Sequence, residues 1–391
     1  MGESPRILHI ITGLGTGGAE MMLYKVATRL SQLGLPQCVV SLREGGPVSE
    51  RIRAAGVVVH ELGMPRGLPT VSGLLELRRI VRQWRPDRVQ GWMYHGNLAA
   101  WAATRGTGLP LLWNVRQTLY DLSLERPLSR LVIRANARLS GAARVIVYNS
   151  QLSRLQHEGF GFASAGGLFI PNGFDTVAMR ADAAARTAWR ERLGLPDDAL
   201  LMGLVARYHP MKNQEGFLRA AARVVAQRPG VHVLLAGRGV DGDNASLREV
   251  IATTGLGGQV HLLGEVADIA SLHAALDVEV SASHTVEAFS NAIGEAMACA
   301  VPCVVTDVGD SAAVVGTTGR VVPPSDEAAL AAALQELLAL PVPARRALGQ
   351  QARERIRQHY DLEAVARTYA ALYRDPALDT GRVRPCLEGC C

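Results

Sequence analysis

The stretch Arg6-Ile7-Leu8-His9-Ile10-Ile11-Thr12-Gly13-Leu14-Gly15-Thr16-Gly17-Gly18-Ala19-Glu20 joins a β-strand to an α-helix through a turn rich in glycine. Its β-branched beginning predicts a strand over 6–12, and the pattern that follows predicts a helix over 18–34. Glycines in such a turn let backbone N–H groups come close to a phosphate or a sugar, and the positive end of the helix favours negative charge. A strand, a turn and a helix in this order are typical of one unit of a parallel α/β sheet.

The same alternation continues through the N-terminal half of the chain. Short apolar runs predict further strands at 37–42, 56–61, 87–92, 109–115, 143–148 and 167–170. Helical patterns lie between them at 47–55, 71–84, 95–105, 127–140 and 150–158. Repeated βαβ units predict a parallel sheet.

A second βαβ series follows residue 198. Its strands are expected at 200–206, 231–236, 259–263, 276–281, 301–306 and 319–322, and its helices at 213–228, 245–254, 267–275 and 290–299. The segment 172–198 breaks the rhythm and has the composition of an interdomain connection. The fold class predicted is therefore α/β, with two Rossmann-like doubly wound domains facing across a cleft.

The domain boundaries follow from these series. We expect an N-terminal domain at 1–180 and a C-terminal domain at 195–355. A last helix at 361–375 is expected to pack back on the first domain, and 376–391 to form a disordered tail.

Composition fits this picture. The chain has 391 residues, of which 48% are hydrophobic and 20% charged, with a net charge of +5 that mildly favours anionic ligands or an anionic membrane surface. No apolar run approaches the roughly 20 residues that span a bilayer, so a cytoplasmic location is expected. The six cysteines lack zinc-ribbon spacing, and no basic run with interleaved aromatics points to nucleic acid.

Two alternatives to a phosphate or sugar site are open for the glycine-rich turn. Gly13, Gly15 and Gly18 fit the dinucleotide pattern GxGxxG, but the second predicted strand ends without the acidic residue that binds a nicotinamide ribose. A tight turn without any ligand is the other alternative.

Two cations flank a strand-to-helix loop in the second series. Arg207 ends a predicted strand, and Lys212 precedes the next helix. Both would lie at the carboxyl edge of the sheet, where they are suited to neutralise the charge of a departing diphosphate. A pair of solvated surface charges is the alternative.

The most informative segment runs from Ser281 to Pro302. A predicted strand ends in small polar residues, a loop carries Glu287, and a helix begins near Ser290 with Glu295 about one turn inside it. Free backbone N–H groups at the start of the helix would form an anion site, and the two carboxylates can each hold sugar hydroxyls. The alternative is one capping and one solvated glutamate.

This segment resembles the signature of a large family of retaining glycosyltransferases of the B-type (GT-B) fold, glycosyltransferase family 4, also called glycosyl transferases group 1. That family contains sucrose synthases, phosphatidylinositol mannosyltransferases and many capsule and lipopolysaccharide enzymes. The resemblance rests on Glu-x7-Glu, the following Ala-Met-Ala-Cys-Ala-Val-Pro, the Arg207 and Lys212 pair and the N-terminal Gly-Gly-Ala-Glu. These motifs occur in the family's order and cover nearly the whole chain.

The resemblance implies that the domain at 1–180 binds the acceptor and the domain at 195–355 binds the nucleotide sugar. It also implies roles for matched residues. Glu287 would contact the donor sugar and Glu295 the ribose hydroxyls, while Arg207 and Lys212 hold the diphosphate. The remaining donor-binding residues that we assign are Gly17, Gly18, Val266, Phe289, Ser290, Asn291 and Ala292. The implied reaction retains the anomeric configuration and needs neither a metal nor another cofactor, since protein cations and a helix terminus supply the positive charge. Asp241-Gly242-Asp243 is interpreted as a loop, not as a metal site.

One departure concerns the N-terminal domain. Where many relatives carry a catalytic-site histidine, this sequence has Arg116-Gln117-Thr118. We assign His95 to comparable space as a catalytic residue, with a histidine bonded within its own loop as the alternative. Asn97, Arg116 and Asn172 are assigned to the acceptor side.

Three functions stay open. The first is transfer of a sugar from a nucleoside-diphosphate donor, with UDP favoured, to a hydroxyl of a glycan or lipid-linked acceptor in envelope or polysaccharide synthesis. The Arg-rich helices at 78–88 and 126–138 would suit peripheral contact with the inner face of a plasma membrane. The alternatives are a nucleotide-sugar 2-epimerase of the same fold and a non-catalytic nucleotide-sugar-binding protein.

Overall fold

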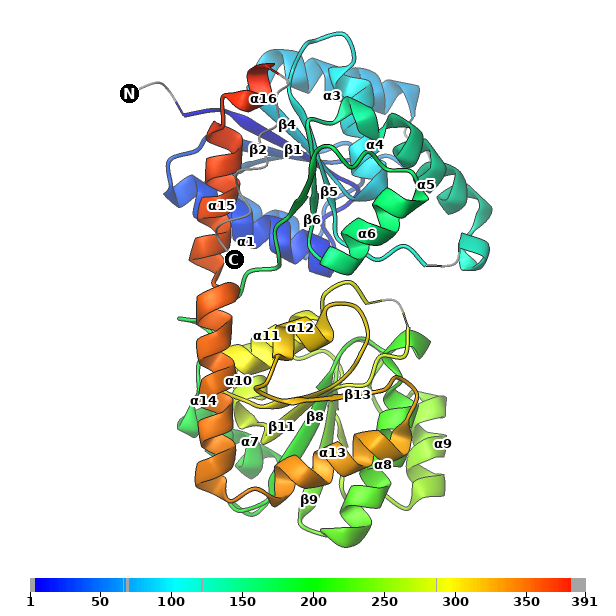
Figure 1. Ribbon diagram of the computed structural model, residues 1–391, viewed down its shortest axis with the longest axis vertical. Helices are drawn as coiled ribbons and strands as arrows, with labels where there is room; N and C mark the ends of the chain where they lie inside the picture. Colours follow the sequence, from blue (N-terminus) through cyan, green and yellow to red (C-terminus); the bar gives the residue numbers. More distant parts are fainter. Residues whose placement is uncertain (1–3, 66, 68–69, 121, 286, 381–391) are drawn as a thin grey trace. The chain divides into compact units, whose positions relative to one another are not determined.

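The computed structural model describes residues 4–65, 67, 70–120, 122–285 and 287–380 (Figure 1). Its internal contacts divide the described chain into two compact units. Unit 1 consists of the chain up to Gly173 together with the segment that begins at Leu362, and unit 2 is Phe174–Asp361. Each unit has its own sheet and its own apolar core, so each is described separately.

Unit 1 is built on a parallel sheet of seven strands in the order β3-β2-β1-β4-β5-β6-β7. The strands are β1 Ile7–Ile11, β2 Gln37–Ser41, β3 Val58–Glu61, β4 Arg88–Trp92, β5 Leu111–Val115, β6 Val145–Tyr148 and β7 Gly167–Phe169. β1 pairs with β2 on one side and with β4 on the other, so the direction of winding reverses between β1 and β4. Doubly wound sheets bind ligands beside such a point, at the carboxyl ends of the strands.

Helices cover both faces of this sheet (Figure 1). One face packs against α1 Gly18–Gln32, α2 Pro47–Ala54 and α15 Leu362–Arg374. The other packs against α3 Val71–Trp84, α4 Met93–Thr104, α5 Pro127–Leu139 and α6 Gln151–Phe160. Burial on both faces explains why these strands are nearly continuous apolar runs in the sequence.

Unit 2 has a parallel sheet of six strands in the order β10-β9-β8-β11-β12-β13. They are β8 Leu200–Val205, β9 Val231–Ala236, β10 Val260–Leu262, β11 Val278–Ser281, β12 Cys303–Thr306 and β13 Arg320–Val322. One face packs against α8 Gln214–Gln227, α9 Ala245–Thr254 and α13 Glu327–Ala339. The other packs against α7 Ala183–Leu193, α10 Ile269–Ala275, α11 Asn291–Ala298, α12 Ser311–Val315 and α14 Val342–His359. The two strand orders confirm the prediction of two doubly wound α/β domains.

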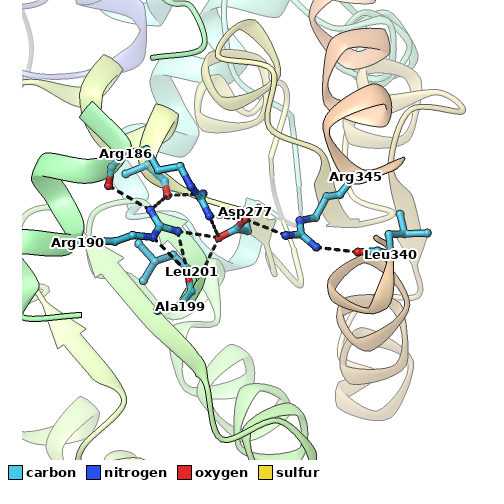
Figure 2. Close-up of polar contacts among 8 residues, drawn as sticks. Arg186, Arg190, Ala199, Leu201, Asp277, Leu340 and Arg345 are labelled. Atoms are coloured by element: carbon cyan, nitrogen blue, oxygen red, sulfur yellow. Dashed lines mark hydrogen bonds and ion pairs between the residues drawn. The ribbon is translucent and has the colours of Figure 1, made fainter. Parts of the chain in front are cut away.

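The composition of segment 172–198 suggested an interdomain connection, but the structure does not bear this out. From Phe174 onward it belongs to unit 2, and its helix α7 is bound there by buried charge. Figure 2 shows Arg190 and Arg186 of α7, together with Arg345 of α14, converging on the Asp277 carboxylate at distances of 2.9, 3.0 and 3.2 Å. The polar, Arg-rich sequence of α7 resembles a solvated linker because these guanidinium groups find their partner only in the folded unit.

The disordered tail was expected to begin at residue 376, but ordered structure continues beyond that residue. Residues 377–380 form the short helix α16, in which Leu378 is buried against the core of unit 1. Asp379 pairs with Arg88 at 2.7 Å. The rest of the expected tail, 381–391, lies outside the described residues.

Candidate active site

The strongest cluster of predicted site residues lies at the carboxyl edge of the unit 2 sheet, where the winding reverses between β8 and β11. The loop after β8 ends in a 3₁₀ turn, Pro210–Lys212, and the loop after β11 carries Glu287. The Lys212 ammonium forms an ion pair with Oε1 of Glu287. The backbone N–H of His284 donates to the Met211 carbonyl at 3.2 Å, which fastens the two loops together. The structure thus joins two residues that are 75 positions apart in the sequence.

The Glu287 carboxylate is held at both oxygens. Its second oxygen, Oε2, accepts a hydrogen bond of 2.7 Å from the Ser283 hydroxyl. The backbone behind it packs so closely on Gly309 that a Cβ there would lie 1.7 Å from the Glu287 carbonyl oxygen. Gly309 also has φ of +63°, a conformation that other L-residues rarely adopt. With only 10% of its side chain exposed, Glu287 is a fixed and largely desolvated carboxylate.

Arg207 lies on the same edge, and its side chain is exposed. It makes no ion pair with any residue in the described part of the chain. Its backbone is fixed, because its carbonyl accepts a hydrogen bond of 2.9 Å from the Gln214 side chain. Burial lowers the pKa of His209, and the charges of Arg207 and Lys212 lower it further. The imidazole is therefore neutral at pH 7, and the edge carries the two cations that the sequence predicted.

The start of α11 lies beside the Glu287 loop. The helix begins at Asn291 with Ser290 as its N-cap, and the Ser290 side chain makes no capping hydrogen bond. Phe289 and Ser290 are buried, and Asn291 and Ala292 are half-buried. The positive end of the helix therefore lies close to the Lys212 and Glu287 pair.

Glu295 lies one turn inside α11 with 18% of its side chain exposed. Its Oε2 approaches Nε2 of the buried His273 at 3.8 Å. Val266 lies in the loop that follows β10 and is half-buried against the core. The neighbouring Glu265 pairs with Arg238 at 3.7 Å.

In unit 1, the glycine-rich turn is the start of α1. Gly17 is the N-cap and Gly18 the first helical residue. A Cβ on Gly17 would lie 2.3 Å from the Glu20 carboxylate, which therefore folds back over the turn. Burial raises the pKa of Glu20, so this carboxyl group is easier to protonate than a solvated one.

His95 lies in the first turn of α4, directly after β4. The helix starts at Met93, whose φ of +64° is unusual for a residue with a side chain. Such strain is frequent where a structure aims a functional side chain. Burial lowers the pKa of His95, and the positive charge of Arg43 lowers it further, so the imidazole is neutral at pH 7.

The three residues assigned to the acceptor side are buried, and their role at the acceptor stays a prediction. Asn97 is fully buried, and its Oδ1 accepts a hydrogen bond of 3.4 Å from the Asn114 backbone. Arg116 donates to Asn114 and to the Tyr369 hydroxyl, at 3.2 Å each, and to Asn172. Asn97 of α4 is thereby bonded to β5, and the Arg116 side chain links Asn114 of β5 to Tyr369 of α15.

Sequence reasoning missed several residues that hold the site. Ser283 and Gly309 fix the Glu287 loop, and neither carries a sequence signal beyond a small side chain. The buried pair of His273 and Glu279 was also missed. Glu279 had a signal, because it is a charged residue inside the apolar run Val278-Glu279-Val280.

Two further properties of the described residues concern metals and membranes. No group of three or more His, Cys, Asp or Glu side chains is arranged to hold a metal ion in the part of the chain that is described. No single helix there has the length and apolar character to cross a bilayer. Among the described helices, only α13 and α14 taken together have this length and apolar character, and they are bent by 112° at their junction.

Comparison with known proteins places this geometry in context. The family model described as "Glycosyl transferases group 1" matches residues 199–340, and the model "Glycosyl transferase 4-like domain" matches residues 17–173. A D-inositol 3-phosphate glycosyltransferase of Kineococcus radiotolerans is 28% identical over 412 residues, which cover 94% of this chain and 92% of that protein. The alignment thus spans both units.

Two further comparisons differ in what they cover. A GDP-mannose-dependent monoacylated alpha-(1-6)-phosphatidylinositol monomannoside mannosyltransferase of Corynebacterium glutamicum is 30% identical over 206 residues, 50% of this chain and 53% of that one. Among solved structures, HepE of Anabaena in complex with UDP superposes with a TM-score of 0.82 at 21% identity, covering 94% of this chain and 99% of that chain. The structural likeness shows the fold.

Proposed function

This chain belongs to the group 1 family of glycosyltransferases, and from that premise we propose that it transfers a sugar from a nucleoside-diphosphate donor to a hydroxyl acceptor. The donor we favour is a UDP-sugar, and the acceptor is a glycan or a lipid-linked molecule. The anomeric configuration is retained, as is characteristic of the family.

The observation that carries the proposal is the pairing of Lys212 with Glu287 at the winding reversal of unit 2. A cation that serves a departing diphosphate and a carboxylate that holds the sugar must be adjacent, because the two groups of the donor are joined by one glycosidic bond. The exposed Arg207 and the start of α11 add positive charge on the same edge. Desolvation of Glu287 strengthens each of these interactions.

The proposed reaction breaks the bond between the anomeric carbon and the diphosphate oxygen, and the electron pair leaves with the diphosphate. Lys212, Arg207 and the α11 N–H groups stabilise that charge. Glu287 binds the sugar hydroxyls and favours the oxocarbenium-like state. The acceptor hydroxyl attacks from the face that the diphosphate leaves, and its proton passes to the diphosphate.

The remaining assignments follow the same scheme. Glu295 binds the ribose, Val266 flanks the base, and Gly17 and Gly18 offer backbone N–H groups to the donor phosphates. His95 lies on the acceptor-binding unit, where its neutral imidazole is suited to accept a hydrogen bond from a sugar hydroxyl. We propose that no metal takes part, and activity that survives EDTA and is not raised by Mg²⁺ or Mn²⁺ would support this.

The donor is tested with a thermal-shift panel of UDP, GDP, ADP and dTDP sugars on the full chain. A true donor raises the midpoint in proportion to its affinity, by RT ln(1 + [L]/Kd). UDP is favoured because HepE was solved with UDP, whereas the Corynebacterium relative is named as dependent on GDP-mannose. Stabilisation by GDP-mannose alone would overturn the choice of UDP.

Transfer itself is tested by incubating the selected donor with acceptors and determining the anomeric configuration of the product by NMR. A product of retained configuration supports the proposal. Interconversion of the donor's sugar at C2 without transfer would identify an epimerase, and binding without any turnover would identify a non-catalytic binding protein.

We also propose peripheral contact with an anionic membrane through α5. Leu128 and Leu131 are exposed on this helix, which also carries Arg130, Arg134 and Arg138. Exposed leucines beside arginines are suited to the headgroup region of anionic lipids. Sedimentation with phosphatidylglycerol vesicles should fall when Leu131 is replaced by Asp, and equal sedimentation with neutral vesicles would contradict the proposal.

A further inference from the structure

A buried histidine lies between two carboxylates of unit 2. His273 of α10 is fully buried, and its Nδ1 lies 3.2 Å from Oε2 of Glu279, which is also fully buried. Its other ring nitrogen, Nε2, lies 3.8 Å from Oε2 of Glu295. The three residues come from α10, β11 and α11, so the imidazole connects the fully buried Glu279 to the partly exposed Glu295.

Glu279 is fixed at its other oxygen. Oε1 accepts a hydrogen bond of 3.2 Å from the backbone N–H of Val205, the last residue of β8. An unpaired carboxylate at this depth would be strongly unfavourable, so its position beside an imidazole has a physical reason. Glu279 therefore holds the Nδ1 side of His273, and the Nε2 side is directed at Glu295.

The charge state agrees with this arrangement. Burial alone lowers the pKa of His273, but the carboxylates of Glu279 and Glu295 outweigh it and raise the pKa to about 9. Burial raises the pKa of Glu279, and the charge of His273 acts to lower it. The thiols of Cys299 and Cys303 also lie near these carboxylates, and their raised pKa values keep both neutral. At pH 7 the imidazole is therefore a cation with a proton on each nitrogen.

We propose that His273 and Glu279 are positioning residues that hold the Glu295 carboxylate ionised and oriented for the ribose hydroxyls of the donor. The inference rests on the proposed function, in which Glu295 binds the ribose. A buried cation beside one oxygen of a carboxylate fixes its rotamer and keeps its charge, so less entropy is lost when the ribose binds. Recognition of the ribose then depends on two residues that never touch the donor.

The experiment compares the affinity of the full chain for UDP and for 2′,3′-dideoxy-UDP, measured by calorimetry. The ratio of the two dissociation constants isolates the contribution of the ribose hydroxyls, because diphosphate and base are common to both ligands. The wild-type protein and the Glu295→Gln, His273→Gln and Glu279→Gln variants are compared, with His157→Gln as a control buried histidine in unit 1.

The wild type should discriminate by roughly 10-fold or more, as expected for hydrogen bonds to a charged group. Glu295→Gln, His273→Gln and Glu279→Gln should each bring the ratio close to one, while His157→Gln keeps the wild-type ratio. A ratio at the wild-type level in the His273 and Glu279 variants would overturn the inference. Absence of binding of every nucleotide in the donor panel by the wild type, in contrast, would overturn the proposed function.

A second measurement needs no variant and so does not depend on the variants folding. The wild-type ratio should be constant from pH 6 to 8 and fall towards one as the pH rises through about 9, where His273 loses its proton. Titration of the diphosphate and of the base affects both ligands equally and cancels in the ratio. A ratio that stays constant up to pH 10 would contradict the role of His273.

Discussion

At the scale of single residues, the candidate active site depends on one carboxylate that is bonded at both oxygens. Glu287 receives the Lys212 ammonium on one oxygen and the Ser283 hydroxyl on the other. Replacing Glu287 by Gln keeps the shape and the bond to Ser283 but removes the charge. We expect kcat to fall about 100-fold or more, because a carboxylate that stabilises an oxocarbenium-like state is lost.

Binding of UDP to Glu287→Gln should be unchanged or tighter, since the Lys212 ammonium no longer has a competing anion. Transfer assays and calorimetry on the same preparation separate the two effects. Near-normal turnover would remove Glu287 from the mechanism, and weak UDP binding would show that the pair acts as one unit in holding the diphosphate.

Gly309 provides a second test at this scale. Gly309→Ala places a methyl group in a strained backbone conformation and against the Glu287 carbonyl, so the loop must move. Gly255→Ala is the matched control, because Gly255 has φ of +71° but no atom within 4 Å of an added Cβ. Both should lose about 1 kcal/mol of stability from the backbone. Only Gly309→Ala should lose most of the transfer activity, and equal activities would show that the close approach is not needed.

At the scale of elements, the Asp277 carboxylate joins two helices to the sheet of unit 2 (Figure 2). Arg190 has 1% of its side chain exposed and Arg186 has 26%, although both pair with Asp277 at about 3 Å. Removing a buried partner leaves a poorly compensated charge and costs about 3–5 kcal/mol, whereas a partly exposed pair contributes much less. Arg190→Ala should therefore lower the melting temperature of unit 2 far more than Arg186→Ala, as calorimetry would detect. Equal losses would mean that burial does not set the strength of these pairs.

The same elements show what could be predicted from the sequence. The strands were located to within about two residues because both faces are covered, so each strand is an apolar run between turns. Helix α7 was mistaken for a linker because Arg190 is polar in sequence and buried in structure. The place of Lys212 and Glu287 at strand ends could be predicted, and the structure pairs the two side chains, while their role in a site stays a prediction. The burial of Arg116 and Asn172 could not be predicted, because it depends on the Tyr369 contact from a helix 253 residues away from Arg116.

At the scale of the whole molecule, the two units contain buried histidines with opposite charge preferences. In unit 1, burial lowers the pKa values of His9 and His157 to about 4, although Gln37 and the Ser153 carbonyl respectively raise them slightly. In unit 2, the carboxylates around His273 raise its pKa to about 9. Folding therefore excludes protons from the core of unit 1 and retains one in the core of unit 2.

Opposite pH dependences of stability follow. Between pH 6.5 and 4 the unfolded chain binds protons that folded unit 1 refuses, so unit 1 loses up to about 3 kcal/mol per histidine as the pH falls. The stabilisation from His273 is complete below pH 6.5 and is lost as the pH rises towards 9. Hydrogen exchange with mass spectrometry, corrected for intrinsic rates, should show β1 and β4 losing protection at pH 5 and β8 and β11 losing it at pH 9. Parallel changes in both sheets would show that these histidines do not control the stability of their units.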